Sequence, residues 1–318
     1  MVYSKKASVW ELSVLQLATD KVWYKGVVLK GNRDIQNKKG KAFQNAIRVI
    51  CSYFTPVLSN QEICIHTKAG LIFTKTDTFG RFQAVSDKAY CEDLKITLSG
   101  SDEVLKLVQN YPVFFQEEQR TLDIISDIDD TILVSNTANI FQRIKTLLFL
   151  VPERRTVIEF TKNIFQAWED VNPRLFYVSK SESNLFGLLT TFIKHNELPL
   201  GVLTLTPYLS FFQLIKGQKP IDFKLNAIRF LITQSRSKHY ILVGDDTQKD
   251  MAIYTTLAKA YPELILKIYI RRTGKDISET QQKMWEELLA TGTSASYFLP
   301  EHADSILKEI QTLKEELI

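Results

Sequence analysis

The stretch Asp123-Ile124-Ile125-Ser126-Asp127-Ile128-Asp129-Asp130-Thr131 ends a short apolar run in closely spaced carboxylates. An apolar run of this length is typical of a buried parallel strand. Side chains alternate between the faces of a strand that rises about 3.3 Å per residue, so Asp127 and Asp129 leave on the same side, about 7 Å apart. Asp130 faces away, and we expect it to be structural. Like charges this close repel, and a bound cation or a shared proton would relieve the repulsion.

This carboxylate pair suits covalent catalysis. One carboxylate can act as the nucleophile while its neighbour serves as the acid and base. In a parallel α/β sheet the pair would lie at the carboxyl end of its strand, which is where ligands bind. The stretch therefore predicts both a fold class and a reaction type.

Composition sets limits on the class of protein. The chain has 318 residues, 45% of them hydrophobic and 24% charged, which is ordinary for a globular protein of two domains. The net charge of +4 is modest, and we expect no nucleic-acid partner. No apolar stretch reaches the length of a membrane span, and we expect no signal peptide. The three cysteines are irregularly spaced, as free thiols of a reducing compartment would be, so we expect a cytoplasmic protein.

Residues 1–118 are expected to form a small, mainly β accessory domain. Short runs rich in Val, Ile, Thr and aromatic residues alternate with polar breaks, a pattern typical of a small antiparallel sandwich or barrel. The expected strands are Val22–Leu29, Ala46–Phe54, Glu62–His66, Leu71–Thr74, Arg81–Val85 and Leu94–Leu98. This part of the sequence has no cluster of acids, histidines or nucleophiles that suggests catalysis, so we expect a structural or docking role.

Residues 119–318 are expected to form the second domain. Strands and helices alternate there, which favours an α/β fold with a parallel sheet covered by helices on both faces. The expected strands are Leu122–Asp127, Leu175–Ser179, Val202–Thr206, His239–Gly244 and Leu266–Arg271. The expected helices are Thr156–Glu169, Asn184–His195, Lys224–Thr233, Lys249–Ala260 and a C-terminal helix over Ala303–Leu317.

Further polar residues fall where strands of this sheet should end or helices begin. Ser179 closes one expected strand, Lys224 opens a helix, and Asp245 and Asp246 end another strand, with Asp250 four residues beyond Asp246. Because all of these residues fall at expected strand ends or helix starts of one sheet, they are more informative together than singly. Ser179 alone could be a helix cap, and Asp246 or Asp250 could be a helix N-terminal acid.

Each of these residues has a role in phosphoryl transfer. Asp127 would attack phosphorus to form an aspartyl-phosphate, and Asp129 would protonate the leaving oxygen and then accept a proton from water. Mg²⁺ is the natural ion for such a carboxylate site. Its expected ligands, direct or through water, are Asp127, Asp129 and Asp245, together with Asp246 or Asp250, between which the sequence does not decide.

The phosphoryl oxygens would be held by Ser179 and Lys224, and Lys224 would also offset charge on the nucleophile. Lys216 and Lys219 compete with Lys224 for this role, but Lys224 opens the helix. Arg271, at a strand end, is open between structural pairing and substrate contact.

In order, the motifs Asp127-Ile128-Asp129-Asp130-Thr131, Ser179, Lys224 and Gly244-Asp245-Asp246 with Asp250 resemble those of the haloacid-dehalogenase-like (HAD) phosphohydrolases. Within that superfamily, residues 120–273 resemble the phosphatidate phosphatase catalytic domain of the actin-patch-protein type. Phe176-Tyr177-Val178-Ser179 and Ile268-Tyr269-Ile270-Arg271 carry this likeness. The resemblance implies a HAD-like Rossmannoid sheet and Mg²⁺-dependent removal of phosphate from phosphatidate.

Two positions depart from the family pattern. The family runs Ser-x-Ser-Pro-Trp-Asn-Leu after the second motif, whereas this chain has Glu182 and Ser183 at the proline and tryptophan positions. The fourth motif is usually Gly-Asp-Ser-Gly, and here Asp246 and Thr247 stand instead. Neither change deletes a catalytic group, but both bear on the substrate.

The sequence therefore predicts a Mg²⁺-dependent phosphomonoester hydrolase that acts on phosphatidate or a related lipid phosphate. The insert between Ile132 and Arg174 mixes apolar and basic residues, so peripheral membrane contact and core packing are both open. The alternatives are a phosphatase of a soluble metabolite or phosphoprotein, and a non-catalytic binding module.

Overall fold

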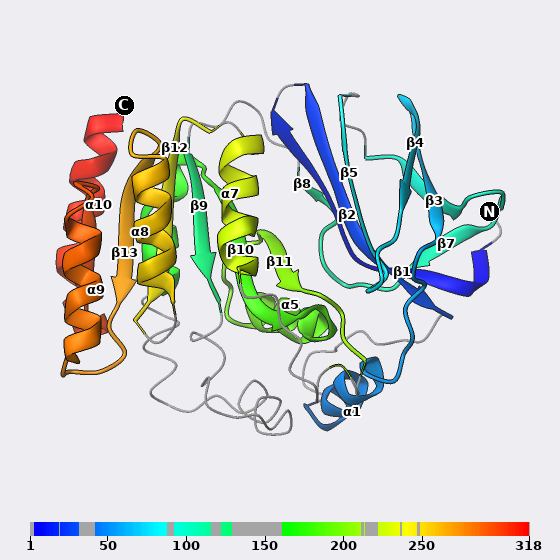
Figure 1. Cartoon of the computed structure of the whole chain (residues 1–318), viewed down its shortest axis with the longest axis horizontal. Coiled ribbons are helices and arrows are strands. Elements are labelled where there is room, and N and C mark those ends of the chain that lie inside the picture. Colours follow the sequence, from blue (N-terminus) through cyan, green and yellow to red (C-terminus); the bar gives the residue numbers. More distant parts are fainter. Residues whose placement is uncertain are drawn as a thin grey trace. The chain divides into compact units, whose positions relative to one another are not determined.

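The structure is a computed structural model, and it describes residues 3–18, 20–31, 42–87, 92–115, 122–128, 161–210, 213, 222–235, 237–246 and 249–317 (Figure 1). The chain divides into two compact units. The first consists of Met1–Glu118, Ser181–His195 and Leu205–Ile221, and the second of Gln119–Lys180, Asn196–Thr204 and Asp222–Ile318. Two segments from the C-terminal half of the sequence therefore cluster with the N-terminal residues.

The first unit contains an eight-stranded sheet in the order β4-β3-β6-β7-β1-β2-β5, with β8 beside β1. Its strands are β1 (Tyr3–Ala18), β2 (Lys21–Lys30), β3 (Glu62–Thr67), β4 (Gly70–Lys75), β5 (Arg81–Ser86), β6 (Leu94–Leu98), β7 (Val104–Leu107) and β8 (Phe114–Phe115). The Thr74 hydroxyl of β4 donates to the Gln83 carbonyl of β5 at 3.0 Å, so the two end strands approach each other as in a barrel. The predicted β domain is confirmed, but the sheet is mixed because β1 runs parallel to β7 and β8.

The strand expected over Ala46–Phe54 is wrong, because α1 (Ala42–Ser52) is a helix. Val49, Ser52 and Tyr53 are buried, whereas Ile47 is 44% exposed. Burial at a spacing of three and four residues is helical, and the β-branched composition of the run concealed this spacing. The sequence also gave no indication of the long strand β1.

The second unit carries most of a six-stranded sheet in the order β11-β10-β9-β12-β13-β14. Its strands are β9 (Leu122–Asp127), β10 (Arg174–Glu182), β11 (Val202–Thr206), β12 (His239–Asp245), β13 (Ile265–Arg271) and β14 (Ala295–Phe298). The pairings of β10, β9, β12, β13 and β14 are parallel. β11 starts where Gly201 meets Leu175 and ends where Thr206 bonds to Ser181, so it runs parallel to β10 as well.

The helices follow the predicted alternation closely. They are α5 (Phe186–His195), α7 (Phe223–Ser235), α8 (Asp250–Ala260), α9 (Glu279–Leu289) and α10 (Ala303–Leu317), with the short 3₁₀ turns η1 (Glu169–Val171), η2 (Ser183–Leu185) and η3 (Pro300–His302). Residues 161–167 are helical too. We did not predict α9 or β14, although α9 begins with a capping box formed by Ser278 and Gln281.

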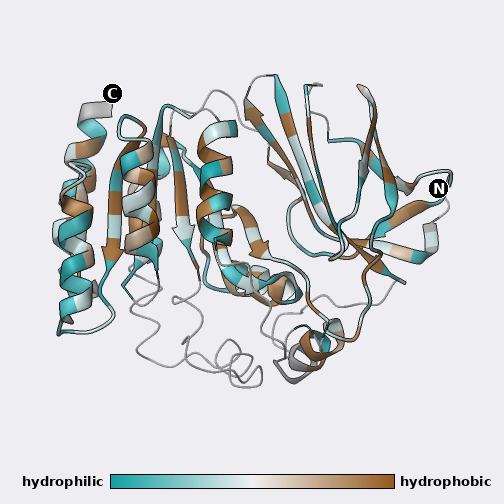
Figure 2. Ribbon diagram, viewed as in Figure 1, coloured by the Kyte–Doolittle hydropathy of each residue, from teal (hydrophilic) through white to brown (hydrophobic). Residues whose placement is uncertain are grey.

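Helices cover both faces of the parallel sheet, as predicted. A side chain at Gly244 would meet Asp250 and Tyr254, so α8 lies on that face of β12. Residues of β13 that alternate to the other face include Lys267, which pairs with Glu309 of α10. Figure 2 shows the strands of this sheet as largely hydrophobic, whereas α9 and α10 carry many hydrophilic residues.

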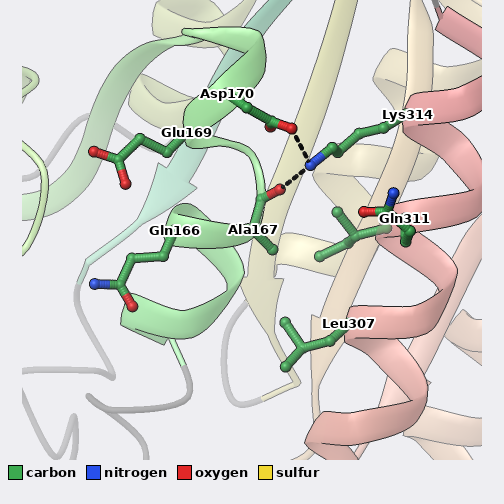
Figure 3. Close-up of a pocket in the computed structure, with 8 residues that line it drawn as sticks. Gln166, Ala167, Glu169, Asp170, Leu307, Gln311 and Lys314 are labelled. Atoms are coloured by element: carbon green, nitrogen blue, oxygen red, sulfur yellow. Dashed lines mark hydrogen bonds and ion pairs between the residues drawn. The ribbon is translucent and has the colours of Figure 1, made fainter.

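Helix α10 packs against the helical residues 161–167 and η1. The ammonium of Lys314 donates to the Ala167 carbonyl at 3.0 Å and pairs with Asp170 at 2.5 Å (Figure 3). Lys314 thus satisfies a carbonyl at the end of that helix. Among the helices of the described residues, none has the length and apolar character that crossing a bilayer requires.

Candidate functional site

Two carboxylates meet at the carboxyl edge of the parallel sheet. Asp127 ends β9 and Asp245 ends the neighbouring strand β12, and the register pairs Ser126 with Val243. Both side chains are buried, at 3% and 5% exposure. They line one cavity of about 20 Å³, room for a single water molecule, together with Ser126, Thr161, Ile164, Val243, Gly244, Arg271 and Phe298.

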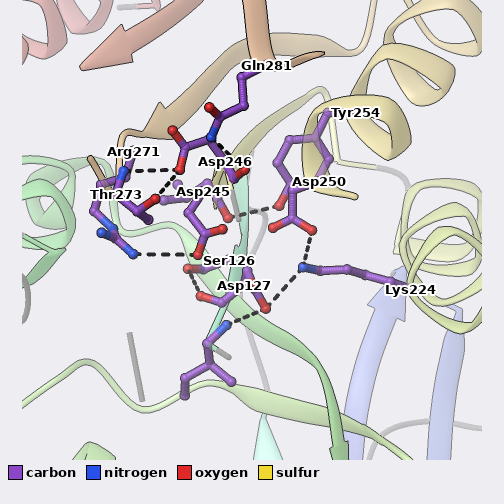
Figure 4. A network of polar contacts seen from close by, with 12 residues as sticks. Ser126, Asp127, Lys224, Asp245, Asp246, Asp250, Tyr254, Arg271, Thr273 and Gln281 are labelled. Atoms are coloured by element: carbon purple, nitrogen blue, oxygen red, sulfur yellow. Dashed lines mark hydrogen bonds and ion pairs between the residues drawn. The ribbon is translucent and has the colours of Figure 1, made fainter. Parts of the chain in front are cut away.

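Lys224 joins Asp127 to Asp250. Its ammonium lies 3.0 Å from Oδ1 of Asp127 and 2.5 Å from Oδ1 of Asp250 (Figure 4). Lys224 is the second residue of α7 and Asp250 is the first of α8, so the N-termini of two helices each supply one member of this group. Oδ1 of Asp127 also accepts the backbone N–H of Ile128 at 2.8 Å, which fixes the carboxylate.

Buried charges of both signs meet in this cluster. Asp127, Asp245 and Asp250 face the cations of Lys224 and Arg271, and the Arg271 guanidinium is 3.5 Å from Oδ2 of Asp245. Burial raises the pKa of Asp250, and the charge of Asp245 raises this pKa further, while Lys224 opposes both effects. A cation would relieve the remaining repulsion.

The carboxylates fit Mg²⁺ in chemical kind. Among the described residues, no three His, Cys, Asp or Glu side chains gather as a metal-binding group. Mg²⁺, however, is usually held by one or two carboxylates together with waters and substrate phosphate oxygens. Asp127 and Asp245 provide such a pair on one cavity. Asp129 lies outside the described residues.

Asp246 and Asp250 contact different residues in the structure. Oδ1 of Asp246 accepts two hydrogen bonds from Thr273, at 3.0 and 2.6 Å, and Oδ2 accepts the Tyr297 hydroxyl at 2.7 Å. Gln281 donates to the Asp246 carbonyl at 3.3 Å (Figure 4). Asp246 therefore ties the end of β12 to the segments around β13, α9 and β14, while Asp250 is the acid that reaches Lys224.

Ser179 and Arg271 lie on the same sheet. Ser179 is fully buried within β10, which continues to Glu182, so the expected strand end at Ser179 is wrong. The last paired residues are Val178 and Asp127, which places Ser179 one residue beyond the end of β9. Arg271 contacts Asp245, as a structural pairing would require. Lys216 and Lys219 lie outside the described residues.

We did not predict that Lys180 and Tyr254 would belong to the site. The charge of Lys180 lowers the pKa of Asp250, and the Tyr254 hydroxyl donates to the Val243 carbonyl at 2.9 Å. A Cβ at Gly244 would lie 2.6 Å from Oδ2 of Asp250, so only glycine admits this approach. Lys180 could have been found from its position beside Ser179, whereas Tyr254 gave no sequence signal.

Residues 122–272 match the family model described as phosphatidate phosphatase APP1, catalytic domain. Phosphatidate phosphatase APP1 of Saccharomyces cerevisiae is 28% identical over 196 residues, which are 61% of this chain and 30% of that protein. An uncharacterized protein of Schizosaccharomyces pombe is 25% identical over 239 residues, which are 73% of this chain and 38% of that protein. The chain thus spans about a third of the length of these relatives.

Among solved structures, a D319A mutant of the PilB minor pilin from Streptococcus sanguinis aligns with 97% of this chain and 88% of its own. Its TM-score is 0.33 and its identity 11%, values too low to bear on the fold. The family match confirms the resemblance predicted for residues 120–273. Membership of the wider HAD superfamily stays a prediction.

Proposed function

Because residues 122–272 match the catalytic domain of APP1-type phosphatidate phosphatases, we propose that this protein removes the phosphate group from phosphatidate or a related lipid phosphate. The observation that carries the proposal is the Lys224 ammonium between Asp127 and Asp250, at the carboxyl edge of a parallel sheet. That edge is the ligand-binding edge of such sheets. The order of strands and motifs also supports a HAD-like Rossmannoid fold for this unit.

Asp127 is the proposed nucleophile. Its carboxylate attacks phosphorus, a bond forms between the carboxylate and the phosphoryl group, and the bond from phosphorus to the lipid oxygen breaks. Asp129 donates a proton to the leaving oxygen and later takes one from the water that attacks the aspartyl-phosphate. Inorganic phosphate leaves, and Asp127 returns as a free carboxylate.

Lys224 and Ser179 are the proposed holders of the phosphoryl oxygens. Asp127 and Asp250 fix the Lys224 ammonium beside the nucleophile, so its charge is in place before the substrate arrives. Arg271 orients Asp245 through their ion pair.

Asp127 and Asp245, with Asp250 next to them, are the residues that would hold Mg²⁺, and Asp129 is expected to join them. When bound, the ion would supply positive charge that neutralises phosphoryl oxygens. We propose that the protein is cytoplasmic and meets its lipid substrate at a membrane surface. The insert between Ile132 and Arg174, for which the sequence leaves membrane contact and core packing both open, lies largely outside the described residues.

The test is phosphate release by the purified protein, with Mg²⁺ or with a chelator. Vesicles that contain phosphatidate, a short-chain phosphatidate and water-soluble phosphomonoesters are the substrates. We expect Mg²⁺-dependent release from phosphatidate well above that from the soluble esters. A preference for soluble esters would contradict the lipid substrate, and no release from any ester would contradict the enzymatic function.

A further inference from the structure

Glu11 has an unusual conformation in the first unit. It lies at an irregularity of β1, between Trp10 and Ser13, with φ of 54°. A residue that carries a Cβ rarely adopts this left-handed region, and such positions persist only where the surroundings enforce them. The side chain is 8% exposed, which is rare for a carboxylate.

The side chain of Gln109 enforces this backbone. Its Oε1 accepts the N–H of Leu12 at 2.7 Å, and its Nε2 donates to the Leu12 carbonyl at 3.0 Å. One carboxamide thus satisfies both backbone groups of Leu12, the residue that follows Glu11 in the irregular segment. The conformation of Glu11 is therefore built into the unit.

The buried carboxylate of Glu11 holds Ser183. Oε1 of Glu11 is 3.4 Å from the Lys25 ammonium, and Oε2 accepts the Ser183 hydroxyl. The indole N–H of Trp10 donates to the Ser183 carbonyl at 3.0 Å. Neighbouring residues of β1 thus bind both the side chain and the backbone of one serine.

Ser183 begins η2 immediately after β10 ends. The next residue, Asn184, binds the backbone of Leu209 twice, at 2.7 and 3.0 Å. Thr206 donates to the Ser181 carbonyl at 3.0 Å. The Glu11 contact is thus one end of a network that fixes the chain directly after β10 and after β11.

We propose that Glu11 is a positioning residue for the catalytic site: through Ser183 it fixes the carboxyl end of β10, and with it the Ser179 hydroxyl four residues earlier in the same chain segment. This inference rests on the function proposed above. It gives the first unit a part in catalysis, beyond the structural or docking role that its sequence predicts.

The matched pair of variants is S183A and S8A. Both serines are 1% exposed, and each hydroxyl donates a hydrogen bond within the first unit, Ser8 to the Gly31 carbonyl at 2.7 Å. We expect S183A to lower kcat for phosphatidate by about tenfold, since small misplacements of catalytic groups are costly. S8A should keep the wild-type kcat. E11A should lower kcat about as much as S183A does. E11Q keeps a side-chain oxygen that can accept the Ser183 hydroxyl, so its kcat should stay near the wild-type value.

A double-mutant cycle separates positioning from general stability. If Glu11 and Ser183 act through Ser179, S183A should have no further effect on kcat in an S179A background. Equal losses in both backgrounds, or a wild-type kcat in S183A, would overturn the inference.

Binding of inorganic phosphate, measured by calorimetry, gives a readout independent of turnover. S183A should weaken it, and S8A should not. Wild-type protein that binds phosphate but does not hydrolyse phosphatidate would refute the proposed function, and the binding comparison would still decide whether Ser183 positions Ser179. Equal binding by S183A and S8A would contradict the inference.

Discussion

The two ends of strand β9 carry the same residue type in different electrostatic settings. At its start, Asp123 is fully buried and receives two hydrogen bonds from Arg174, at 2.7 and 2.9 Å, and one from Ser235 at 2.8 Å. At its end, Asp127 shares the single ammonium of Lys224 with Asp250. Asp123 pairs with Arg174, whereas Asp127 and Asp250 both contact Lys224.

This difference shows why burial of charge alone does not mark a catalytic site. A carboxylate with a bidentate arginine is electrostatically complete and serves the fold. Buried carboxylates that share a cation repel one another unless a ligand adds positive charge, and such groups are typical of functional sites. The Asp127 end should therefore control turnover, and the Asp123 end should control stability.

The largest effect is expected from D127N. Replacement of the proposed nucleophile by a neutral isostere should lower kcat by about 10⁴-fold or more, by analogy with losses of other nucleophiles. The melting temperature should remain close to that of wild type, because Lys224 keeps its ion pair with Asp250 and the loss of the Asp127 charge also removes like-charge repulsion from Asp245 and Asp250. Phosphate release and thermal unfolding, measured on the same preparation, check both statements.

For D123N we expect a loss of stability without a loss of turnover. The variant leaves the buried Arg174 guanidinium without its counter-charge, which should cost about 3–5 kcal/mol of unfolding free energy. Denaturant unfolding measures this loss, and the kcat of the folded fraction should match wild type. A D123N protein with wild-type stability and little activity would reverse the comparison.

K224M tests the shared cation. Loss of the ammonium removes a holder of the phosphoryl oxygens and leaves two carboxylates uncompensated, so kcat should fall by about 10²- to 10³-fold. Phosphate release is the measurement, with the exposed Lys238 as the control position in K238M. Equal rates for the two variants would remove Lys224 from the mechanism.

The smallest predicted effect is the change of unfolding free energy with pH that Tyr240 causes, and its direction can be checked. Burial raises the pKa of Tyr240 to about 12, and its hydroxyl lies 2.7 Å from Ser235 near Asp123. Between pH 10 and 12 the unfolded state releases this proton while the folded state keeps it. Stability therefore falls as pH rises through this window, by about 2–3 kcal/mol.

In Y240F, the loss of unfolding free energy that Tyr240 causes between pH 10 and 12 should be absent. Unfolding free energies of wild type and Y240F, measured at several pH values above 9, should converge as the pH rises. A constant difference across the window would contradict the raised pKa.

The sequence was most informative where local pattern decides structure. Strands β9 and β11 and helix α10 have the predicted bounds because an apolar run or a helical repeat specifies each of them. Helix α1 was mistaken for a strand because its β-branched residues also suit a sheet.

Long-range contacts were the part that the sequence could not provide. Asp246 and Asp250 look equivalent in sequence, and only Thr273 and Tyr297, 27 and 51 residues beyond Asp246, tell them apart. The bond between Glu11 and Ser183 spans 172 residues, and no local pattern announces it. Tertiary packing, which places these partners, decides which acid is free for chemistry.

The most direct test of the central claim, that Asp127 forms a bond to phosphorus, is acid quenching of the enzyme during turnover of phosphatidate labelled with ³²P in its phosphate group. We expect a hydroxylamine-sensitive label on the peptide that contains Asp127, and no label in D127N. Rapid turnover without a labelled enzyme, or D127N that hydrolyses phosphatidate at the wild-type rate, would contradict the claim.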